Sequence, residues 1–233
     1  MTQIDRRSAL AVIPARGGSK RVPRKNIRDL HGKPLLAWSL QTAISSGLFS
    51  RVTVSTDDEV TRQIAQESGA HLMGTRPAHL SHDHASTGQV MAHEVTLALI
   101  ENPALEYVCC IYPAAFAVTA TDLTSSFDLL QSSGKPFVAA VTQYAHPVQR
   151  AMRITDDGSL TFATPETASM RTQDFESMWH DAGQFYWGST QAWLDGTSIL
   201  SNACAYPIES SRVVDIDTED DWRRAEQIMN SRT

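Results

Sequence analysis

Short, mostly apolar runs alternate with segments of helical spacing along the first 142 residues of this 233-residue chain. Runs of this length and composition are typical of strands that are buried on both faces of a sheet. The expected strands are 10–14, 51–55, 71–73, 107–112 and 137–142, and the expected helices are 35–46, 58–68, 89–101 and 121–132. Because a helix between two strands makes a crossover connection, we expect neighbouring strands to run parallel.

This order predicts an α/β fold of three layers, in which helices cover both faces of a mostly parallel, Rossmann-like sheet. Ligands of such sheets bind beyond the carboxyl ends of the strands. The loop that follows the first expected strand therefore lies where a binding site is expected.

The alternation stops between residues 143 and 184. Prolines and a glycine interrupt this region, and residues 153–162 are typical of a hairpin. Regular structure returns with an expected strand at 185–188 and a closing helix at 219–229. We therefore expect a single domain over residues 1–233, with 143–184 as an inserted arm.

Positive charge is concentrated in one loop. Six of the 20 basic residues lie within residues 16–28, which contain no acidic residue, although the whole chain has a formal net charge of −6. A nucleic-acid backbone needs a broad basic face, so this distribution argues against a nucleic-acid partner. A single basic loop in an acidic protein suits a compact anion such as a phosphate or a carboxylate.

The sequence does not indicate a membrane segment or an oxidising compartment. The apolar runs are shorter than a membrane span, and residues 1–15 do not form a signal peptide. The three cysteines are too few for a disulfide framework and lack the spacing of a zinc site. We expect a cytoplasmic protein with reduced thiols in its core and no membrane partner.

The basic loop begins with Gly17, Gly18 and Ser19 directly after the first expected strand. Glycines let backbone amides approach an anion, and the cations that follow neutralise its charge. The loop matches neither the Walker A nor the Rossmann glycine pattern. The alternative is a solvated basic loop, which the position after a buried strand disfavours.

Two carboxylates stand at alternate positions in the segment Asp215-Ile216-Asp217. In an extended segment they share one face while Ile216 points away. Two such oxygen ligands suit a Mg²⁺ ion that also contacts substrate phosphates. Capping of the closing helix by Thr218 or Asp217 is an alternative that the pattern leaves open.

Two further polar regions are candidates for ligand binding. Residues 171–174 and 180–187 combine Arg, Gln and His with aromatic residues, as a sugar pocket or a subunit interface does, and Arg171 suits a bidentate carboxylate contact. The loop that carries Arg76, Ala85 and Thr87 has groups that suit a base or a ribose. The alternatives are ordinary surface loops, with aromatic residues of 180–187 in the core.

The stretches IPARGGSKRVPRKNI, STDD, RPAHLS and DIDTEDD, in that order, resemble the acylneuraminate cytidylyltransferases. Enzymes of this family activate nine-carbon sugar acids as CMP conjugates. The stretches CCIYP, RTQDF and HDAGQFYW resemble the pseudaminic acid branch of the family. The resemblance covers nearly the whole chain. It implies a fold of the nucleotide-diphospho-sugar transferase type, magnesium as the cofactor, and a homodimer in which the arm reaches the neighbouring site.

The resemblance also implies roles for individual residues. The residues expected to bind CTP are Ala15, Arg16, Gly17, Ser19, Lys25, Asn26, Arg76, Ala85 and Thr87. The residues expected to bind the sugar acid are Tyr112, Arg171, Gln173, His180 and Gln184, with Arg171 reaching across the dimer. Asp215 and Asp217 are the expected magnesium ligands, and Arg16, Lys20 and Asp217 are the expected catalytic residues.

The implied reaction is an in-line attack of the sugar's anomeric hydroxyl on the α-phosphorus of CTP, with pyrophosphate leaving. Charge accumulates on phosphate oxygens, so positioning and electrostatic stabilisation carry the catalysis. Tyr112 stands where the sialate enzymes have Gln, and Ala114-Ala115-Phe116 stands where they have Thr-Ser-Pro, so the sugar contacts differ. Sialic acid, legionaminic acid and an eight-carbon acid such as Kdo are alternative acceptors. An Asp-x-Asp glycosyltransferase and a non-catalytic nucleotide-binding protein are alternative classes.

Overall fold

A computed structural model describes residues 8–19 and 21–231 of the chain, and its centre is one six-stranded sheet. The strands are β1 (Ala9–Pro14), β4 (Arg51–Ser55), β5 (Tyr107–Ile111), β6 (Phe137–Gln143), β9 (Trp179–Ser189) and β10 (Ala203–Pro207). They lie in the order β10-β6-β9-β5-β1-β4, and β9 runs antiparallel between β5 and β6 while the other pairs are parallel. The expected mostly parallel sheet is confirmed.

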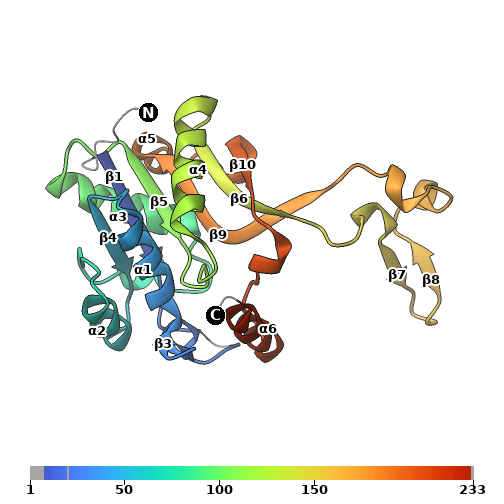
Figure 1. The fold of residues 1–233 in the computed structure, drawn as a ribbon, viewed down its shortest axis with the longest axis horizontal. Coiled ribbons are helices and arrows are strands. Elements are labelled where there is room, and N and C mark those ends of the chain that lie inside the picture. The colour runs from blue at the N-terminus through green and yellow to red at the C-terminus, as the bar shows by residue number, and fades with distance from the viewer. Residues whose placement is uncertain (1–7, 20, 232–233) are drawn as a thin grey trace.

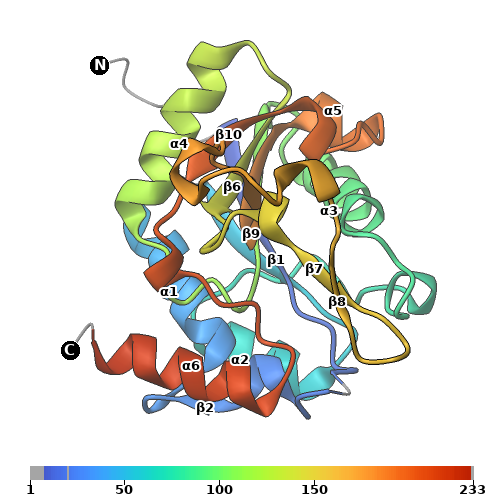
Figure 2. The same ribbon diagram turned by 90° about the vertical axis from the view of Figure 1, so that its right-hand side faces the viewer.

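Helices cover both faces of this sheet, as the sequence predicts. Helices α1 (Leu35–Ser46), α2 (Glu59–Glu67) and α4 (Ala120–Ser133) pack on one face, and α3 (Thr87–Glu101) and α5 (Thr190–Leu194) pack on the other. Figure 2 shows the sheet between α1 and α4 on one side and α3 and α5 on the other. Alternate residues of β1 enter the two cores, since Ala11 and Ile13 face α1 and Val12 faces α3.

Side-chain caps define where the helices begin. Ser86, Thr119 and Thr218 each accept a hydrogen bond from the third residue of their helix, whose own side chain accepts one from the cap residue's backbone N–H. Such reciprocal caps satisfy backbone N–H groups that a helix start leaves unpaired. The acidic run after residue 217 thus partly serves the start of α6 (Glu219–Asn230), in which Asp221 completes the cap.

The structure corrects several element predictions. Residues 71–73 form no strand, since only His71 makes a single bridge to Thr53. The expected strand at 185–188 is the end of the much longer β9. Strand β10, helix α5 and the small β2–β3 hairpin (Asp29–Leu30 and Lys33–Pro34) were not predicted. These elements are short or lie at the sheet edge, so tertiary contacts outweigh their weak sequence patterns.

An arm leaves the body between β6 and β9 (Figure 1). It carries the hairpin of β7 (Met152–Ile154) and β8 (Leu160–Phe162), which turns at Gly158 with a φ of 83° as the sequence predicts. The arm was expected at residues 143–184, but residue 143 ends β6 and residues 179–184 belong to β9. The segment between these two strands spans residues 144–178. Ile154 and Leu160 are 77% and 65% exposed in the single chain.

The closing helix α6 packs beside the carboxyl end of the sheet on a third apolar cluster. Trp222, Ala225 and Met229 of α6 meet Val214 and Ile216 from the preceding segment and Phe116 from the loop after β5. This cluster fixes the acidic segment 215–217 against the body. No helix within residues 8–19 and 21–231 is long and apolar enough to cross a membrane.

Candidate active site

One large cavity of about 690 Å³ opens at the carboxyl ends of β1 and β5. Ten of the residues predicted for the site line it: Arg16, Ser19, Lys25, Asn26, Arg76, Ala85, Thr87, Tyr112, Asp215 and Asp217. They come from segments that are far apart in the sequence, within residues 16–26, 76–87, 112 and 215–217. The cavity therefore lies where open α/β sheets bind their ligands.

The loop after β1 is held against the start of α2. The Gly17 backbone N–H donates to Asp57 Oδ1 at 3.0 Å, and a Cβ on Gly17 would lie 2.5 Å from the Cβ of Asp58. Only glycine allows this approach. Asn26 Nδ2 donates to the carbonyl oxygen of Arg16 at 3.0 Å, and Arg16 Nη1 contacts Asp83 Oδ1 at 2.7 Å. Lys20 lies outside the described residues, so its predicted role stays a prediction.

The acidic segment faces this basic loop across the cavity. All three residues line the cavity, but Ile216 is fully buried whereas Asp215 is exposed and Asp217 half-buried, which is the alternation expected of an extended segment. Arg21 Nη2 lies 2.8 Å and Lys25 Nζ 3.8 Å from Asp217 Oδ1, and Lys25 also donates to the carbonyl oxygen of Ile216. Without substrate, the cations and carboxylates of the cavity thus partly neutralise each other.

Burial shifts the ionisation of two groups at this end. Desolvation, with the nearby charge of Asp217, raises the pKa of Asp215 above its ordinary value. Desolvation also lowers the pKa of Lys25, although the charges of Asp217 and Asp215 oppose this. Both shifts favour the neutral form of the side chain. A cation bound near Asp215 or an anion bound near Lys25 would therefore favour the charged form again.

The donor set of the acidic segment fits a hard divalent cation. Among the described residues no group of three or more His, Cys, Asp or Glu side chains is arranged to hold a metal. Asp215 and Asp217 are two carboxylates on one face of a cavity, which is the small protein contribution that Mg²⁺ takes when substrate phosphates and water fill its other positions. The residues present therefore fit Mg²⁺ and not a closed structural metal site.

Arg76 is held in the cavity wall by a buried polar network. Its Nε donates to Ser55 Oγ at 2.9 Å and its Nη2 to the Ser55 carbonyl oxygen at 2.5 Å. Ser55 Oγ in turn donates to Glu94 Oε1 at 2.5 Å, and Glu94 is buried in α3. Desolvation lowers the pKa of Arg76 from its ordinary value, against the opposing charges of Glu94 and Asp57. The network fixes the guanidinium at the cavity edge.

Hydroxyls and aromatic rings form the other end of the cavity. Thr87 Oγ1 and the Tyr112 hydroxyl oxygen are 2.6 Å apart, and the Tyr112 ring packs edge-on against that of Tyr186 with the centroids 5.7 Å apart. Tyr186 donates to Asp181 Oδ2, and the Gly183 backbone N–H donates to Asp181 Oδ1 at 2.9 Å. Burial raises the pKa of both tyrosines, so they remain neutral hydrogen-bonding groups over a wide pH range.

Six predicted site residues do not line the cavity of the single chain: Ala15, Gly17, Arg171, Gln173, His180 and Gln184. Gln184 is buried and its side chain donates to Ala182 O at 3.1 Å, while its carbonyl accepts from the Tyr112 N–H at 2.9 Å. Arg171 lies in the arm, paired with Asp174 at 3.0 Å. The His180 ring lies 4.6 Å from that of Tyr144 at the root of the arm, with the two ring planes tilted by 52°.

The prediction missed several residues that do line the cavity: Arg21, His82, Asp83, Asp181, Gly183 and Tyr186. Arg21 had a signal in the basic run, and Asp181 and Tyr186 lie within a stretch that was singled out only for its composition. Which residues of that stretch face the cavity depends on the register of β9 with β5 and β6. Register is a tertiary property, so the sequence alone did not separate them.

Comparison with known proteins gives concordant matches. Residues 10–187 match the family described as cytidylyltransferase. The chain is 35% identical over 213 residues to the pseudaminic acid cytidylyltransferase of Campylobacter jejuni, a match that covers 91% of this chain and 92% of that protein. It is 28% identical over 222 residues to N-acylneuraminate cytidylyltransferase B of Danio rerio, covering 95% of this chain and 51% of that protein.

A solved structure shares the fold. The CTP complex of CMP:2-keto-3-deoxy-manno-octonic acid synthetase superposes with a TM-score of 0.71, covering 97% of this chain and 99% of that one. Sequence identity between the two is 16%, so this likeness concerns the arrangement of the elements and not the side chains of the site.

Proposed function

The chain belongs to the cytidylyltransferase family and is a nucleotidyltransferase, and we propose that it transfers CMP from CTP to the anomeric hydroxyl of pseudaminic acid and releases pyrophosphate. The observation that carries the proposal is a single cavity with two different ends. One end combines a basic loop with two carboxylates, and the other is lined by hydroxyls and aromatic rings. The first suits a triphosphate and the second a polyol.

The nucleotide end would bind CTP through the loop after β1. Arg16, Ser19 and Lys25 present cationic and hydroxyl groups to the triphosphate, while Asn26 already supports the loop through the Arg16 carbonyl. Arg76, Ala85 and Thr87 would contact the ribose and the base. Lys20, outside the described residues, would add a further charge. Binding of the triphosphate would replace Asp83 and Asp217 as the partners of the loop's cations.

Asp215 and Asp217 would hold Mg²⁺ at the same end. When bound, this ion would neutralise charge on the phosphate oxygens. The cations of the loop serve the same purpose from the opposite wall, since Arg21 and Lys25 face Asp217 across the cavity. The site is thus arranged to stabilise negative charge that develops around the α-phosphorus.

The reaction would be a single displacement. The anomeric oxygen forms a bond to the α-phosphorus of CTP while the bond to the β-phosphate oxygen breaks, so that pyrophosphate leaves and the configuration at phosphorus inverts. The hydroxyl proton is accepted by Asp217, our candidate for the base. Arg16 and Lys20 stabilise the charge on the phosphate oxygens. No covalent enzyme intermediate is needed.

The sugar end would distinguish the acceptor. The Tyr112 hydroxyl, held by Thr87, and the carboxylate of Asp181, held by Tyr186 and Gly183, are fixed hydrogen-bonding groups in that wall. Fixed polar groups discriminate strongly, because a mismatched substrate leaves them unpaired. Gln184 would act through its backbone, which anchors Tyr112. Gln173 and His180 would join the site only if the arm of a second chain brought them there.

The arm would pack on a second copy of the chain. Its apolar side chains Met152, Ile154 and Leu160 are exposed in the single chain, and none of them belongs to an apolar cluster of the described residues. In such a homodimer Arg171 would leave Asp174 and contact the sugar carboxylate in the neighbouring cavity. Light scattering should give twice the chain mass for the wild type and one chain mass for an Ile154→Asp, Leu160→Asp variant. A wild-type monomer would contradict the dimer.

Pyrophosphate release tests the proposed reaction directly. The protein is incubated with CTP, Mg²⁺ and pseudaminic acid, with N-acetylneuraminic acid and no-sugar reactions in parallel. We expect release with pseudaminic acid alone, together with a product of the mass of CMP-pseudaminic acid. Release with N-acetylneuraminic acid instead would keep the chemistry and contradict the acceptor. CTP binding without release with any sugar acid would contradict catalysis.

A further inference from the structure

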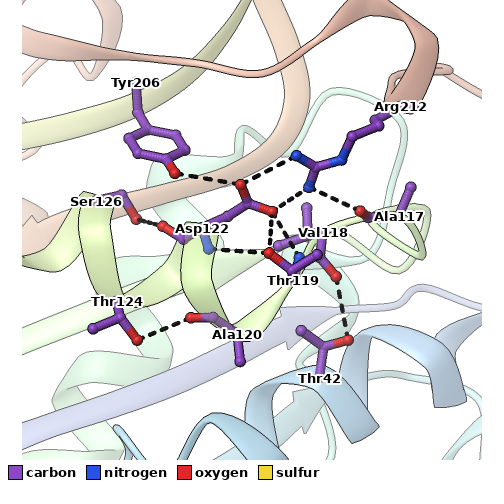
Figure 3. Close-up of polar contacts among 10 residues, drawn as sticks. All are labelled: Thr42, Ala117, Val118, Thr119, Ala120, Asp122, Thr124, Ser126, Tyr206 and Arg212. Atoms are coloured by element: carbon purple, nitrogen blue, oxygen red, sulfur yellow. Dashed lines mark hydrogen bonds and ion pairs between the residues drawn. The ribbon is translucent and has the colours of Figure 1, made fainter.

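A largely buried ion pair outside the cavity joins the chain just before the acidic segment to helix α4. Arg212 contacts both carboxylate oxygens of Asp122, Oδ1 at 3.3 Å and Oδ2 through a second hydrogen bond (Figure 3). The Asp122 side chain is 9% exposed and that of Arg212 28%. Tyr206 of β10 donates to Asp122 Oδ1 at 3.3 Å. Residues 206 and 212, which lie close together in the sequence, therefore meet the distant helix α4 at one carboxylate.

The same carboxylate caps α4. The Thr119 backbone N–H and hydroxyl donate to Asp122 Oδ2 at 2.8 and 2.7 Å. Burial alone would raise the pKa of Asp122, but hydrogen bonds from Arg212 and Thr119 outweigh it and hold the pKa below its usual value. Asp122 is therefore ionised at neutral pH, and Arg212 has a permanent charged partner.

Arg212 also contacts the loop whose first residues line the cavity. Its Nη2 donates to the Ala117 carbonyl oxygen at 3.1 Å, within the loop that follows β5. The start of that loop, Tyr112 to Ala114, lines the cavity, and Thr42 of α1 holds its end through the Val118 carbonyl at 3.4 Å (Figure 3). Arg212 thus connects the chain that leads to the acidic segment with the loop after β5, whose first residues line the cavity.

The arginine of this ion pair lies close in sequence to the two carboxylates of the acidic segment. Only Val213 and Val214 lie between Arg212 and Asp215, and both are buried, as is Ile216. Stability alone is a weak reason for such a pair, since buried ion pairs are often matched by apolar residues of similar size. A buried, hydrogen-bonded pair can instead fix the position of the backbone next to it.

We propose that Arg212, held by Asp122, is a positioning residue that fixes the Asp215–Asp217 segment against the loop after β5, so that the two carboxylates are in place before the metal and CTP arrive. This inference rests on the proposed function, in which Asp215 and Asp217 hold Mg²⁺. It adds two residues, Asp122 and Arg212, that do not line the cavity and touch no substrate.

The test compares Arg212→Gln and Arg212→Lys with two matched controls. Arg223→Gln removes an arginine from an exposed ion pair with Asp220 on α6, and Tyr206→Phe removes a different hydrogen bond to Asp122. Binding of Mn²⁺ to the nucleotide-free proteins is measured by electron paramagnetic resonance. We expect Arg212→Gln to raise the dissociation constant about tenfold, as loss of a supporting contact does at metal sites, with a smaller change for Arg212→Lys and none for the controls.

Amide exchange followed by NMR supplies a readout that needs no metal. The Val213 N–H donates to the Ser210 carbonyl and the Asp217 N–H to Asp221 Oδ2, so both amides report on the segment. In the nucleotide-free wild type they should exchange as slowly as the amides at the start of α4. In Arg212→Gln they should exchange at least about tenfold faster, while amides of α2 do not change. Exchange at the unprotected rate in the wild type would overturn the proposal even if neither variant folded.

Asp215→Asn separates this inference from the function on which it rests. If Asp215→Asn abolishes Mn²⁺ binding and CMP transfer, while both Arg212 variants bind Mn²⁺ and exchange like the wild type, Arg212 has no positioning role and the proposed function stands. If Asp215→Asn retains both binding and transfer, the assigned metal ligands are wrong and the inference falls with them. Weaker Mn²⁺ binding in Arg212→Gln, together with loss of Mn²⁺ binding in Asp215→Asn, is the expected, supporting result.

Discussion

The two ends of the cavity are built in different ways. The nucleotide end comes from two continuous stretches, the loop after β1 and the segment 215–217, whose charges pair with each other across the gap. The sugar end comes from single residues of β9 and of the segment after β5, in which Tyr112 packs edge-on against Tyr186 and Tyr186 donates to Asp181. Thr87 of α3, a proposed nucleotide contact, lies where the two ends meet, with Oγ1 2.6 Å from the Tyr112 hydroxyl. The first end is a charged surface that a ligand must neutralise, and the second is a wall whose groups are already satisfied.

This difference predicts that substitutions at the two ends affect different steps. In the proposed complex the mutual ion pairs at the nucleotide end would be exchanged for contacts to the triphosphate, so changes there should affect the chemical step with every acceptor. The fixed hydroxyls at the sugar end do not carry charge, so changes there should alter the choice of acceptor and leave the use of CTP intact. The expected effects below run from the largest to the smallest.

Asp217→Ala should reduce turnover by at least about 10³-fold with any acceptor, because it removes one of two proposed metal ligands and the partner of Arg21 and Lys25. The fold should survive, since the Asp217 side chain is 33% exposed. Turnover and thermal unfolding are measured together. Asp220→Ala, which removes an exposed acid from the start of α6, is the control and should behave as wild type. An active, still metal-dependent Asp217→Ala would remove the assignment.

Arg16→Ala should lower turnover by about 10²–10³-fold, the loss typical of removing one donor that stabilises the transition state. In the free protein Arg16 forms an exposed ion pair with Asp83, so the effect on stability should be small. Arg24→Ala, in the same loop but away from the cavity, is the matched control. Steady-state rates are measured with CTP and pseudaminic acid, and a wild-type rate in Arg16→Ala would contradict this role of Arg16.

Tyr112→Phe should lower kcat/KM for the sugar acid by about tenfold and leave the KM for CTP unchanged. The variant keeps the ring that packs edge-on against Tyr186 and loses the hydroxyl that lies 2.6 Å from Thr87 Oγ1. Tyr107→Phe, at the opposite end of β5, is the control. If KM for CTP rose and the sugar parameters did not change, the two ends of the cavity would have been assigned the wrong way round.

Alkaline pH should lower the free energy of unfolding through the two buried tyrosines at the sugar end of the cavity. Burial raises the pKa of Tyr112 and Tyr186 above the value of 10.0 for a free tyrosine, so the fold favours their neutral forms. Their contribution to stability is therefore complete below about pH 10 and is lost as the pH rises above it, by at most about 1.4 kcal/mol per pH unit for each tyrosine. Urea unfolding between about pH 8 and 11 should show a shallower loss in Tyr112→Phe, and an identical slope would contradict this.

Much of the body could be predicted because its signals are local. The runs that form β1, β4, β5 and β6 are mostly apolar, and the helices between them begin at recognisable caps. Strand β10 and helix α5 had no comparable signal, and residues 71–73 do not form the expected strand. Their state is decided by what they pack against, which a local pattern does not contain.

The same distinction holds within the site. The basic loop and the segment Asp215-Ile216-Asp217 could be predicted because each is continuous, and alternation in an extended chain already places both carboxylates on one face. Asp181 and Tyr186 could not be separated from His180 and Gln184, which lie in the same stretch. A β-bulge between β6 and β9 shifts the register there, and it decides which of these side chains reach the cavity.

Local features of the chain were thus enough to predict the fold class and to single out the basic loop and the pair of carboxylates, because strand burial, glycine geometry and alternation act over a few residues. The folded molecule was needed to show that these stretches face each other, that Tyr112 meets Thr87 and Tyr186, and that Arg212 pairs with Asp122. Those contacts join residues that are distant in the sequence. Their formation depends on the packing of the whole sheet and not on any local preference.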